Sequence, residues 1–314
     1  MSGTVDDATA KGVAIAISGV TRRFGASAAV DRLSLEVTRG EIFALVGPDG
    51  AGKTTLMRLV CGALALDAGT IRVDGVDVVR RTAAVQAAIG YMPQRFSLYP
   101  DLSVLENLRF YGDIFGVGAA FPERARSLLD EFALARFVGR RADALSGGMK
   151  QKLALACTLI HSPPTILLDE PTAGVDPVSR REFWRILYGI NRRGTTIFVS
   201  TPYMDEAERA HRVGFITGGR ILDVATPQAL KDGVRGEVVE IACEARGEAR
   251  RALRGDPAVR SVEIFGETLH ALVGSAADAI PELTRRLAAA NVPNASLRRI
   301  PASLEDAFVA RLAA

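Results

Sequence analysis

The chain has 314 residues, of which 48% are hydrophobic and 24% charged, with a formal net charge of +3. These values exclude a disordered chain, indicate one large domain with a small one, and show no sign of a nucleic-acid binder. No stretch approaches the roughly 18 apolar residues of a membrane span. Residues 1–10 are polar and small, with no apolar core of a signal peptide, and are expected to form a flexible tail. Cys61, Cys157 and Cys243 are widely spaced, which favours reduced thiols in a cytosolic protein.

Short strands are predicted along the first hundred residues, because apolar residues there alternate or form short runs. Residues 13–17 are expected to form an edge strand and residues 21–25 a turn. Further strands are predicted at 33–37, 42–46, 69–75 and 89–94, the last one stopped by Pro93.

One segment after the strand at 42–46 fits the phosphate-loop pattern G-x-x-x-x-G-K-[ST]. It consists of Gly47, Pro48, Asp49, Gly50, Ala51, Gly52, Lys53, Thr54 and Thr55. Leu56, Leu59 and Val60 follow as one face of a helix, which is the context that the motif requires. Backbone N–H groups and the positive helix end would face the β- and γ-phosphates. Lys53 would add a mobile charge and the Thr54 hydroxyl could bind Mg²⁺. The alternative is a chance Gly-rich turn before a helix.

The middle of the chain changes to helical spacing, with helices predicted over 103–115, from Pro122 and over 146–161. This helical block, at about residues 95–160, interrupts the strands. Strands are expected again at 165–170 and 195–200, followed by a hairpin of 213–217 and 220–224. Strands that alternate with helices around a phosphate loop indicate an α/β domain with a parallel core, at residues 11–228.

The pattern changes after Pro227, where the elements run β-α-β-β-α-β between residues 236 and 312. This order is similar to a small ferredoxin-like unit. We therefore expect an α+β domain at residues 236–314, with a boundary near 226–235 and a regulatory or dimerisation role. It carries no phosphate loop and so is not expected to repeat the phosphate-binding site of the larger domain.

Two carboxylates, Asp169 and Glu170, close the apolar strand that starts at residue 165. They are expected at the carboxyl edge of the sheet, where ligands bind in such folds. Asp169 suits Mg²⁺, and Glu170 suits orienting and deprotonating an attacking water. The alternative is an acidic pair that caps the turn at Pro171.

Another anion-binding feature is Ser146-Gly147-Gly148, which starts the helix at 146–161. It offers free N–H groups, a hydroxyl and a positive helix end. One chain cannot easily bring this element to its own phosphate loop, whereas a head-to-tail dimer can. Taken alone, it could be a plain helix cap.

The chain resembles the ATP-binding subunits of ABC transporters over about residues 12–225. The resemblance rests on the joint order of the phosphate loop, Gln94, Leu145-Ser146-Gly147-Gly148, Asp169-Glu170 and Ala173-Gly174-Val175-Asp176. Residues 91–112, 169–177 and 203–208, together with 303–308 after a small C-terminal domain, look most like the bacterial drug-export-type branch.

The family implies a role for each matching residue. Phe24 would stack on adenine, and Gln94 would touch Mg²⁺ and the water and relay to the membrane subunit. Ser146, Gly147 and Gly148 would reach the γ-phosphate of a partner's ATP, and Asp176 would lie at the dimer contact. Taken alone, Phe24 could be a core aromatic and Gln94 a solvated polar residue.

The sequence also departs from the family pattern. Met149 and Asp49 replace a frequent Gln and Asn, which are mild changes. After the strand at 196–199 the family usually carries a His that contacts the γ-phosphate, and here Pro202 occupies that position. Proline has no donor, so hydrolysis at this chain's own site comes into question. His211 is expected to be an exposed histidine within the next helix.

The resemblance therefore implies an ATPase with ATP and Mg²⁺, bound to the cytoplasmic face of the membrane through a permease and paired with a second ATP-binding subunit. A soluble ABC-type protein acting on ribosomes or DNA is the first alternative, although such proteins usually carry two ATPase halves or a coiled-coil insertion. A kinase-like phosphate-loop enzyme is the second, and Ser146-Gly147-Gly148 argues against it.

Overall fold

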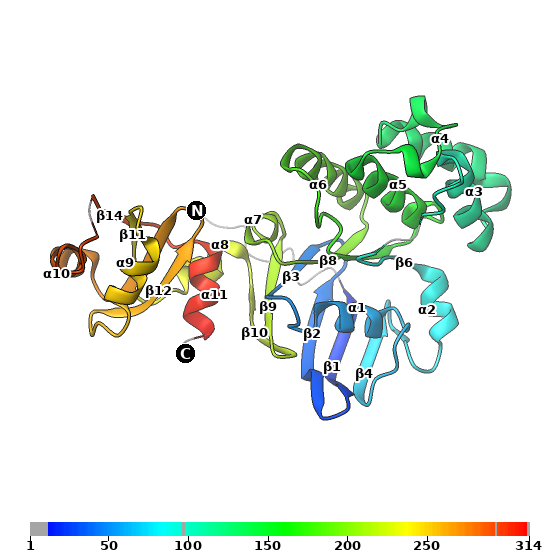
Figure 1. The fold of residues 1–314 in the computed structure, drawn as a ribbon. Coiled ribbons are helices and arrows are strands. Elements are labelled where there is room, and N and C mark those ends of the chain that lie inside the picture. The colour runs from blue at the N-terminus through cyan, green and yellow to red at the C-terminus, as the bar shows by residue number, and fades with distance from the viewer. Residues whose placement is uncertain (1–11, 96–97, 293, 313–314) are drawn as a thin grey trace, which may run out of the picture. The chain divides into compact units, whose positions relative to one another are not determined.

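The computed structural model describes residues 12–95, 98–292 and 294–312, so the expected tail at residues 1–10 lies outside the described residues. The chain divides into two compact units, Met1–Ile221 and Leu222–Ala314 (Figure 1). The sequence prediction put this boundary slightly later, near residues 226–235. None of the helices in the described ranges is long and apolar enough to span a membrane.

The centre of the first unit is a six-stranded sheet in the order β10-β9-β3-β8-β7-β6. Its strands are β3 (Ile42–Val46), β6 (Ile89–Met92), β7 (Thr165–Asp169), β8 (Thr196–Thr201), β9 (Arg212–Thr217) and β10 (Arg220–Ala225). The pairs from β6 to β9 are parallel, and β3, β7 and β8 are buried throughout. Burial on both faces explains their continuous apolar sequences. The predicted parallel core is confirmed.

A second, antiparallel sheet has the order β2-β1-β4-β5. Its strands are β1 (Val13–Phe24), β2 (Ser27–Thr38), β4 (Ala68–Val73) and β5 (Val76–Asp77). The predicted edge strand at 13–17 and turn at 21–25 were wrong, because β1 lies between two neighbours and runs to Phe24. Thr21 pairs with Ala68 and Arg22 with Val30. Backbone pairing on both sides holds this polar end of β1 in the sheet without apolar alternation.

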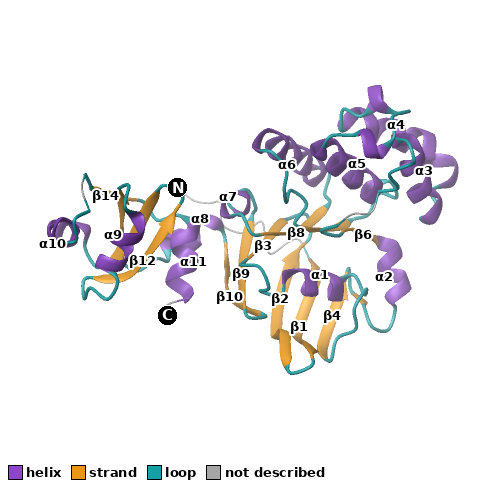
Figure 2. Ribbon diagram, in the orientation of Figure 1, coloured by secondary structure: helices purple, strands orange, loops and turns teal. Residues whose placement is uncertain are grey.

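Seven α-helices occur among the described residues of the first unit. They are α1 (Lys53–Val60), α2 (Thr82–Ala88), α3 (Val104–Ile114), α4 (Phe121–Glu131), α5 (Gly147–Leu159), α6 (Pro177–Arg192) and α7 (Met204–Ala207). Helix α1 contacts β7 of one sheet and β4 and β2 of the other, so it lies between the two sheets. Helices α3, α4 and α5 gather into the helical block that separates β6 from β7 (Figure 2). Ser103 and Glu106 form a capping box that fixes the start of α3.

The C-terminal unit has its own four-stranded antiparallel sheet, in the order β12-β13-β11-β14. Its elements are α8 (Pro227–Asp232), β11 (Glu237–Ala242), α9 (Arg246–Leu253), β12 (Val259–Phe265), β13 (Thr268–Val273), α10 (Ala276–Ala289), β14 (Ser296–Ile300) and α11 (Leu304–Leu312). Leu269 and Ala271 of β13 join the core under α9 and α10. His270, between them, reaches Asp306 of α11, so α11 lies on the opposite face.

The three cysteines are free thiols. Cys61 and Cys157 are buried, and burial raises the pKa of both thiols. Their protonated form makes them poor nucleophiles. Cys243 is half-buried, and the reduced state of the three thiols in a cytosolic protein stays a prediction.

Candidate active site

The phosphate loop connects β3 to α1, as the sequence predicted. Gly47 passes so close to β9 that a Cβ there would lie 2.1 Å from the Ile216 carbonyl oxygen. Gly52 has φ 104°, and a Cβ there would lie 2.3 Å from the Ala29 carbonyl oxygen. Both positions therefore require glycine. The turn they form leads directly into α1.

The start of α1 offers backbone donors without acceptors. Its first helical hydrogen bond runs from Leu56 N to Gly52 O, at 2.9 Å. The N–H groups of Lys53, Thr54 and Thr55 precede it and have no helical acceptor. Helix α1 has no side-chain cap and no acidic residue in its first turn. This end of the helix suits an anion.

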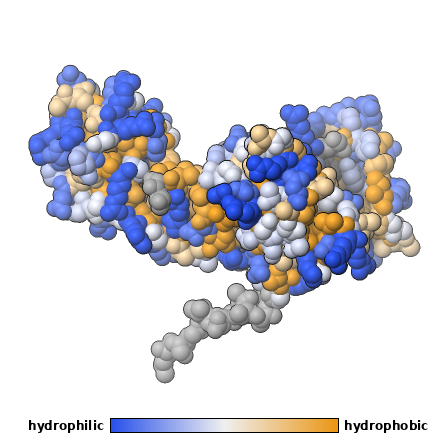
Figure 3. Space-filling model, turned by 90° about the horizontal axis from the view of Figure 1, so that it is seen from below, coloured by the Kyte–Doolittle hydropathy of each residue, from blue (hydrophilic) through white to orange (hydrophobic). Residues whose placement is uncertain are grey.

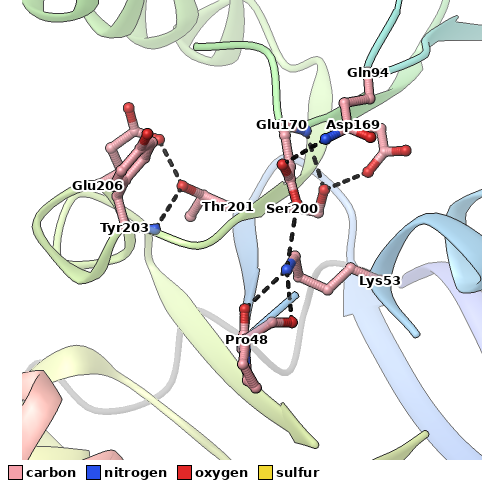
Figure 4. Close-up of polar contacts among 10 residues, drawn as sticks. Pro48, Lys53, Gln94, Asp169, Glu170, Ser200, Thr201, Tyr203 and Glu206 are labelled. Atoms are coloured by element: carbon pink, nitrogen blue, oxygen red, sulfur yellow. Dashed lines mark hydrogen bonds and ion pairs between the residues drawn. The ribbon is translucent and has the colours of Figure 1, made fainter. Parts of the chain in front are cut away.

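The Lys53 ammonium group is buried beneath the loop, with 4% of the residue exposed. Its Nζ donates to the carbonyl oxygens of Gly47 at 2.8 Å and Pro48 at 3.0 Å. It also lies 3.2 Å from Glu170 Oε1 (Figure 4). Lys53 thus connects the phosphate loop, which follows β3, with Glu170, which follows β7.

Asp169 ends β7 and is fully buried. Ser200, at the end of the neighbouring strand β8, donates from Oγ to Asp169 Oδ1 at 2.7 Å. Asp169 Oδ2 is buried without a hydrogen-bond partner among the described residues. A buried carboxylate oxygen with no donor fits a cation. Asp169 therefore fits the Mg²⁺ role assigned to it, while Thr54 and Gln94 remain predicted ligands.

Tyr91, on β6, lies near Asp169 and stays neutral. Burial raises the pKa of Tyr91 to about 12, and the negative charge of Asp169 adds to the rise. The phenol therefore contributes no charge near neutral pH.

Glu170 is held in a strained conformation at the centre of the site. Its φ of 48° lies in the left-handed region, which is costly for a residue with a side chain. Its N–H donates to the Oγ and the carbonyl oxygen of Ser200, each at 3.1 Å. Gln94 Nε2 donates to Glu170 Oε2 at 2.9 Å, and Lys53 contacts the other oxygen (Figure 4). The structure thus brings together Lys53, Gln94, Asp169 and Glu170.

Ser200 is a site residue that the sequence reasoning missed. It has no motif, but it ends the strand beside β7, and its partner in the parallel register is Asp169. The carboxyl ends of adjacent parallel strands share an edge of the sheet. Ser200 is the last residue of the strand predicted at 195–200, and this position could have indicated a site residue.

The segment after β8 contains a second, buried polar network. Glu206 has no exposed surface and accepts from Thr172 Oγ1 at 2.6 Å and Thr201 Oγ1 at 2.8 Å. Thr201 Oγ1 in turn accepts from Tyr203 N at 3.1 Å. This network fixes the backbone on both sides of Pro202. In the sequence, the feature that could have indicated this network is Glu206, an acidic residue shortly after the strand predicted at 195–200.

Pro202 lies at the same edge of the sheet as the phosphate loop. Thr201, the residue before it, pairs in register with Val46, the residue before Gly47. Proline supplies no side-chain or backbone donor at this position. Arg180 stacks on the Tyr203 ring at 4.1 Å, so the Tyr203 side chain is directed to α6.

His211 was predicted within a helix, and this was wrong. It lies between α7 and β9, where its N–H donates to Ile42 O and its Nδ1 accepts from Ile42 N, both at 2.9 Å. His211 is exposed, as expected, but it anchors the start of β3. It therefore has a structural role away from the phosphate loop.

The remaining predicted site residues do not join the Lys53–Glu170 cluster. Phe24 is 52% exposed, which rules out the alternative of a core aromatic, and Arg22 lies 5.0 Å from its ring centroid. Ser146 caps α5 by accepting from Met149 N. Among the described residues, Ser146, Gly147 and Gly148 form no hydrogen bond or ion pair with the loop. Asp176 is exposed and caps α6.

Comparison with known proteins identifies the family. A sequence profile described as ABC transporter matches residues 30–173. The Nod factor export ATP-binding protein I of Paraburkholderia xenovorans (strain LB400) is 41% identical over 303 residues, which cover 94% of this chain and 96% of that protein. The chain belongs to the ABC transporter ATP-binding family. It therefore carries an ABC ATPase domain, as its motifs predicted.

Other ABC relatives have export-related names. The "Probable multidrug ABC transporter ATP-binding protein YbhF" of Escherichia coli (strain K12) is 40% identical over 301 residues. That match covers 94% of this chain but 51% of YbhF, so the chain spans about half of that relative. The daunorubicin resistance ATP-binding protein DrrA3 of Streptomyces coeruleorubidus is 35% identical, with 94% and 95% covered. The resemblance to the drug-export-type branch is confirmed.

Solved structures support the fold of the ABC domain. An ATP-binding subunit of an ABC transporter has a TM-score of 0.64 and 27% identity, covering 69% of this chain and 92% of that one. The ATP-binding cassette MJ0796, described as a dimer in a post-hydrolysis state bound to ADP and Pi, has a TM-score of 0.62 and 26% identity, covering 68% and 98%.

Proposed function

We propose that this chain binds and hydrolyses ATP to power an export-type ABC transporter. The observation that carries the proposal is the contact of Glu170 with both Lys53 and Gln94, beside the free N–H groups at the start of α1. These groups are a base, a phosphate-binding cation and a polar orienting group at one edge of a sheet. The export-related names of the relatives support the direction of transport.

Each residue of the cluster has a chemical task in this proposal. Lys53 and the loop N–H groups bind the β- and γ-phosphates, and Phe24 is an exposed ring available to adenine. Glu170 accepts the proton of the attacking water, which Gln94 helps to orient. Thr54, Gln94 and Asp169 would hold Mg²⁺, which neutralises charge on the phosphate oxygens when bound. The contacts with Lys53 and Gln94 hold the two carboxylate oxygens of Glu170 in place.

The active assembly in this proposal is a head-to-tail pair of ATP-binding subunits with a membrane permease. Ser146, Gly147 and Gly148 sit at the start of α5 and would contact ATP on the partner's loop. In support, Ser146, Gly147 and Gly148 form no hydrogen bond with the phosphate loop of their own chain among the residues that the structure describes. The pair would lie on the cytoplasmic face of the membrane, held there by the permease.

Two measurements test this function together. The purified chain should release phosphate from ATP only when Mg²⁺ is present. Gentle purification from membranes should recover an integral membrane protein with it. Recovery of ribosomes or DNA instead would favour the alternative of a soluble ABC-type ATPase.

Within this function, the chain would be the less active member of an unlike ATPase pair. Pro202 removes the donor that the family places beside the γ-phosphate, while Ser146-Gly147-Gly148 is intact and could complete a partner's site. The Tyr203 ring is held against Arg180, and its N–H is used by Thr201. The Tyr203 N–H is therefore not available as a replacement donor, and the alternative is that the Tyr203 hydroxyl or a water supplies one. A homodimer should be slow.

The test is Pro202→His. A lost charge-assisted hydrogen bond corresponds to about 1.5–3 kcal/mol, or roughly 10- to 150-fold in rate. The variant homodimer should therefore turn over at least about tenfold faster than the wild type. A wild-type homodimer that already works at the median enzyme rate of about 10 s⁻¹, with no gain in the variant, would contradict the proposal.

A further inference from the structure

A cavity of about 700 Å³ in the C-terminal unit is lined by three arginines, and no side-chain carboxylate lines it among residues 222–292 and 294–312. Arg235 precedes β11, Arg260 belongs to β12, and Arg311 belongs to α11. Ser261 and Leu272, a cross-strand pair of β12 and β13, also line it. The cavity therefore opens on the sheet face that carries α11, away from the core under α9 and α10.

An irregularity in β12 accounts for the position of Arg260. Val259 pairs with Val273, and the next pair is Ser261 with Leu272, so Arg260 has no cross-strand partner. Such a bulge redirects the side chain of the extra residue. The Arg260 guanidinium donates to the Arg235 carbonyl oxygen at 2.7 Å, which ties the two segments together at the cavity. This contact leaves the positive charge of Arg260 uncompensated.

The charge balance of the cavity differs from that of its surroundings. Arg311 is paired with Asp223 at 2.8 Å. Arg235 and Arg260 form no ion pair with a carboxylate within residues 12–95, 98–292 and 294–312. Most other arginines of the unit do have one: Arg250 with Glu263, Arg251 with Glu248, Arg285 with Glu282, Arg286 with Asp256, Arg298 with Glu240 and Arg299 with Glu237. The face of this unit that Figure 3 shows carries hydrophilic residues with hydrophobic ones between them.

We propose that this cavity binds a small phosphate-bearing anion, at a site separate from the ATP site. Two uncompensated guanidinium groups match the charge of a phosphate monoester, about −1.5 to −2 near pH 7, better than that of a single carboxylate. The guanidinium fork suits phosphate oxygens, and the volume lies within the roughly 300–1,000 Å³ of small-molecule sites. The phosphate could belong to a free metabolite or to a lipid headgroup.

The test titrates the full chain with pyrophosphate by calorimetry, at fixed ionic strength. Every protein carries Lys53→Ala, so that the phosphate loop contributes no binding. In this background Arg235→Gln and Arg260→Gln should each weaken pyrophosphate binding by about tenfold or more. Arg254→Gln is the matched control, because Arg254 is exposed, belongs to the same unit and does not line the cavity. It should change the affinity by less than about twofold.

A second arm identifies the source of the phosphate. Vesicles of phosphatidylcholine with phosphatidic acid are compared with phosphatidylcholine alone in a flotation assay. Binding to the first vesicles but not to pyrophosphate supports the site with a lipid headgroup as ligand, and binding to pyrophosphate supports a free phosphate compound. No binding to either probe would overturn the proposal. An equal loss in Arg254→Gln would also overturn it, because diffuse surface charge would then explain the binding.

Discussion

Ser200 should contribute to catalysis, although it lies outside the motifs that identify the family in this sequence. Its Oγ donates to Asp169 Oδ1 at 2.7 Å and accepts from Glu170 N at 3.1 Å, and the residue is fully buried. Ser200→Ala removes the hydroxyl that orients both carboxylate-bearing residues. Asp169 Oδ2 has no hydrogen-bond partner in the described part of the chain, so the variant leaves the Asp169 carboxylate there without a side-chain donor.

The size of the effect follows from the kind of bond that is lost. A hydrogen bond to a charged group contributes about 1.5–3 kcal/mol, which corresponds to roughly 10- to 150-fold in kcat. The phosphate loop is unchanged in the variant, so the affinity for ATP should stay near that of the wild type. We therefore expect a fall in kcat, a higher Mg²⁺ requirement and little change in KM.

Steady-state phosphate release, measured over a range of ATP and Mg²⁺ concentrations, tests this expectation. Thr158→Val is the control, because it also removes a buried hydroxyl, which donates to Ala154 O at 2.9 Å within α5. The control should lower thermal stability without a matching loss of kcat. A kcat of Ser200→Ala within about threefold of the wild type would refute the role of Ser200, since it falls short of the smallest expected loss.

Two further predictions concern the phosphate loop and the C-terminal unit. Lys53→Ala should abolish ATP binding while the melting temperature of the fold stays normal, because Lys53 is the side-chain cation under the loop. A nucleotide titration and a melting curve of the same variant check this. Near-normal affinity for ATP would argue against it. Burial alone would lower the pKa of His270, but the hydrogen bond and the charge of Asp306 outweigh it, so the pKa of His270 is raised. Burial alone would raise the pKa of Asp306, but the hydrogen bonds from His270 and Ser303 outweigh it, so the pKa of Asp306 is lowered. The pair therefore stabilises the unit at mildly acidic pH, and this stabilisation is lost as pH rises through the raised pKa of His270 and as pH falls through the lowered pKa of Asp306. Hydrogen exchange of α11 from pH 5.5 to 8.5 should show faster opening at high pH in the wild type and a smaller change in His270→Gln; identical pH profiles would contradict it.

Much of the active site could be predicted because its residues lie in short motifs with a local structural cause. The phosphate loop needs glycine where β9 and β2 approach its backbone, and those glycines are visible in the sequence. Asp169 and Glu170 end an apolar run, which predicts a buried strand and its edge. These signals depend on neighbours in the chain, so one sequence is enough to find them.

The parts that could not be predicted depend on residues far apart in the chain. Ser200 reaches Asp169 only because β7 and β8 are neighbours in register, and β1 extends to Phe24 because β2 and β4 pair with it on both sides. His211 became a partner of Ile42 through the same kind of long-range approach. Apolar periodicity does not record these pairings.

The central claim is that Glu170 is the base that activates water at this site. Glu170→Gln keeps the size of the side chain and its contact with Gln94 but removes the charge, so ATP should still bind while turnover falls by about 10²–10⁴-fold. The most direct measurement is phosphate release by Glu170→Gln under saturating ATP and Mg²⁺, with nucleotide binding measured on the same sample. The account predicts ATP retained unhydrolysed in a stable dimer. Turnover within about threefold of the wild type, well short of that loss, would contradict it.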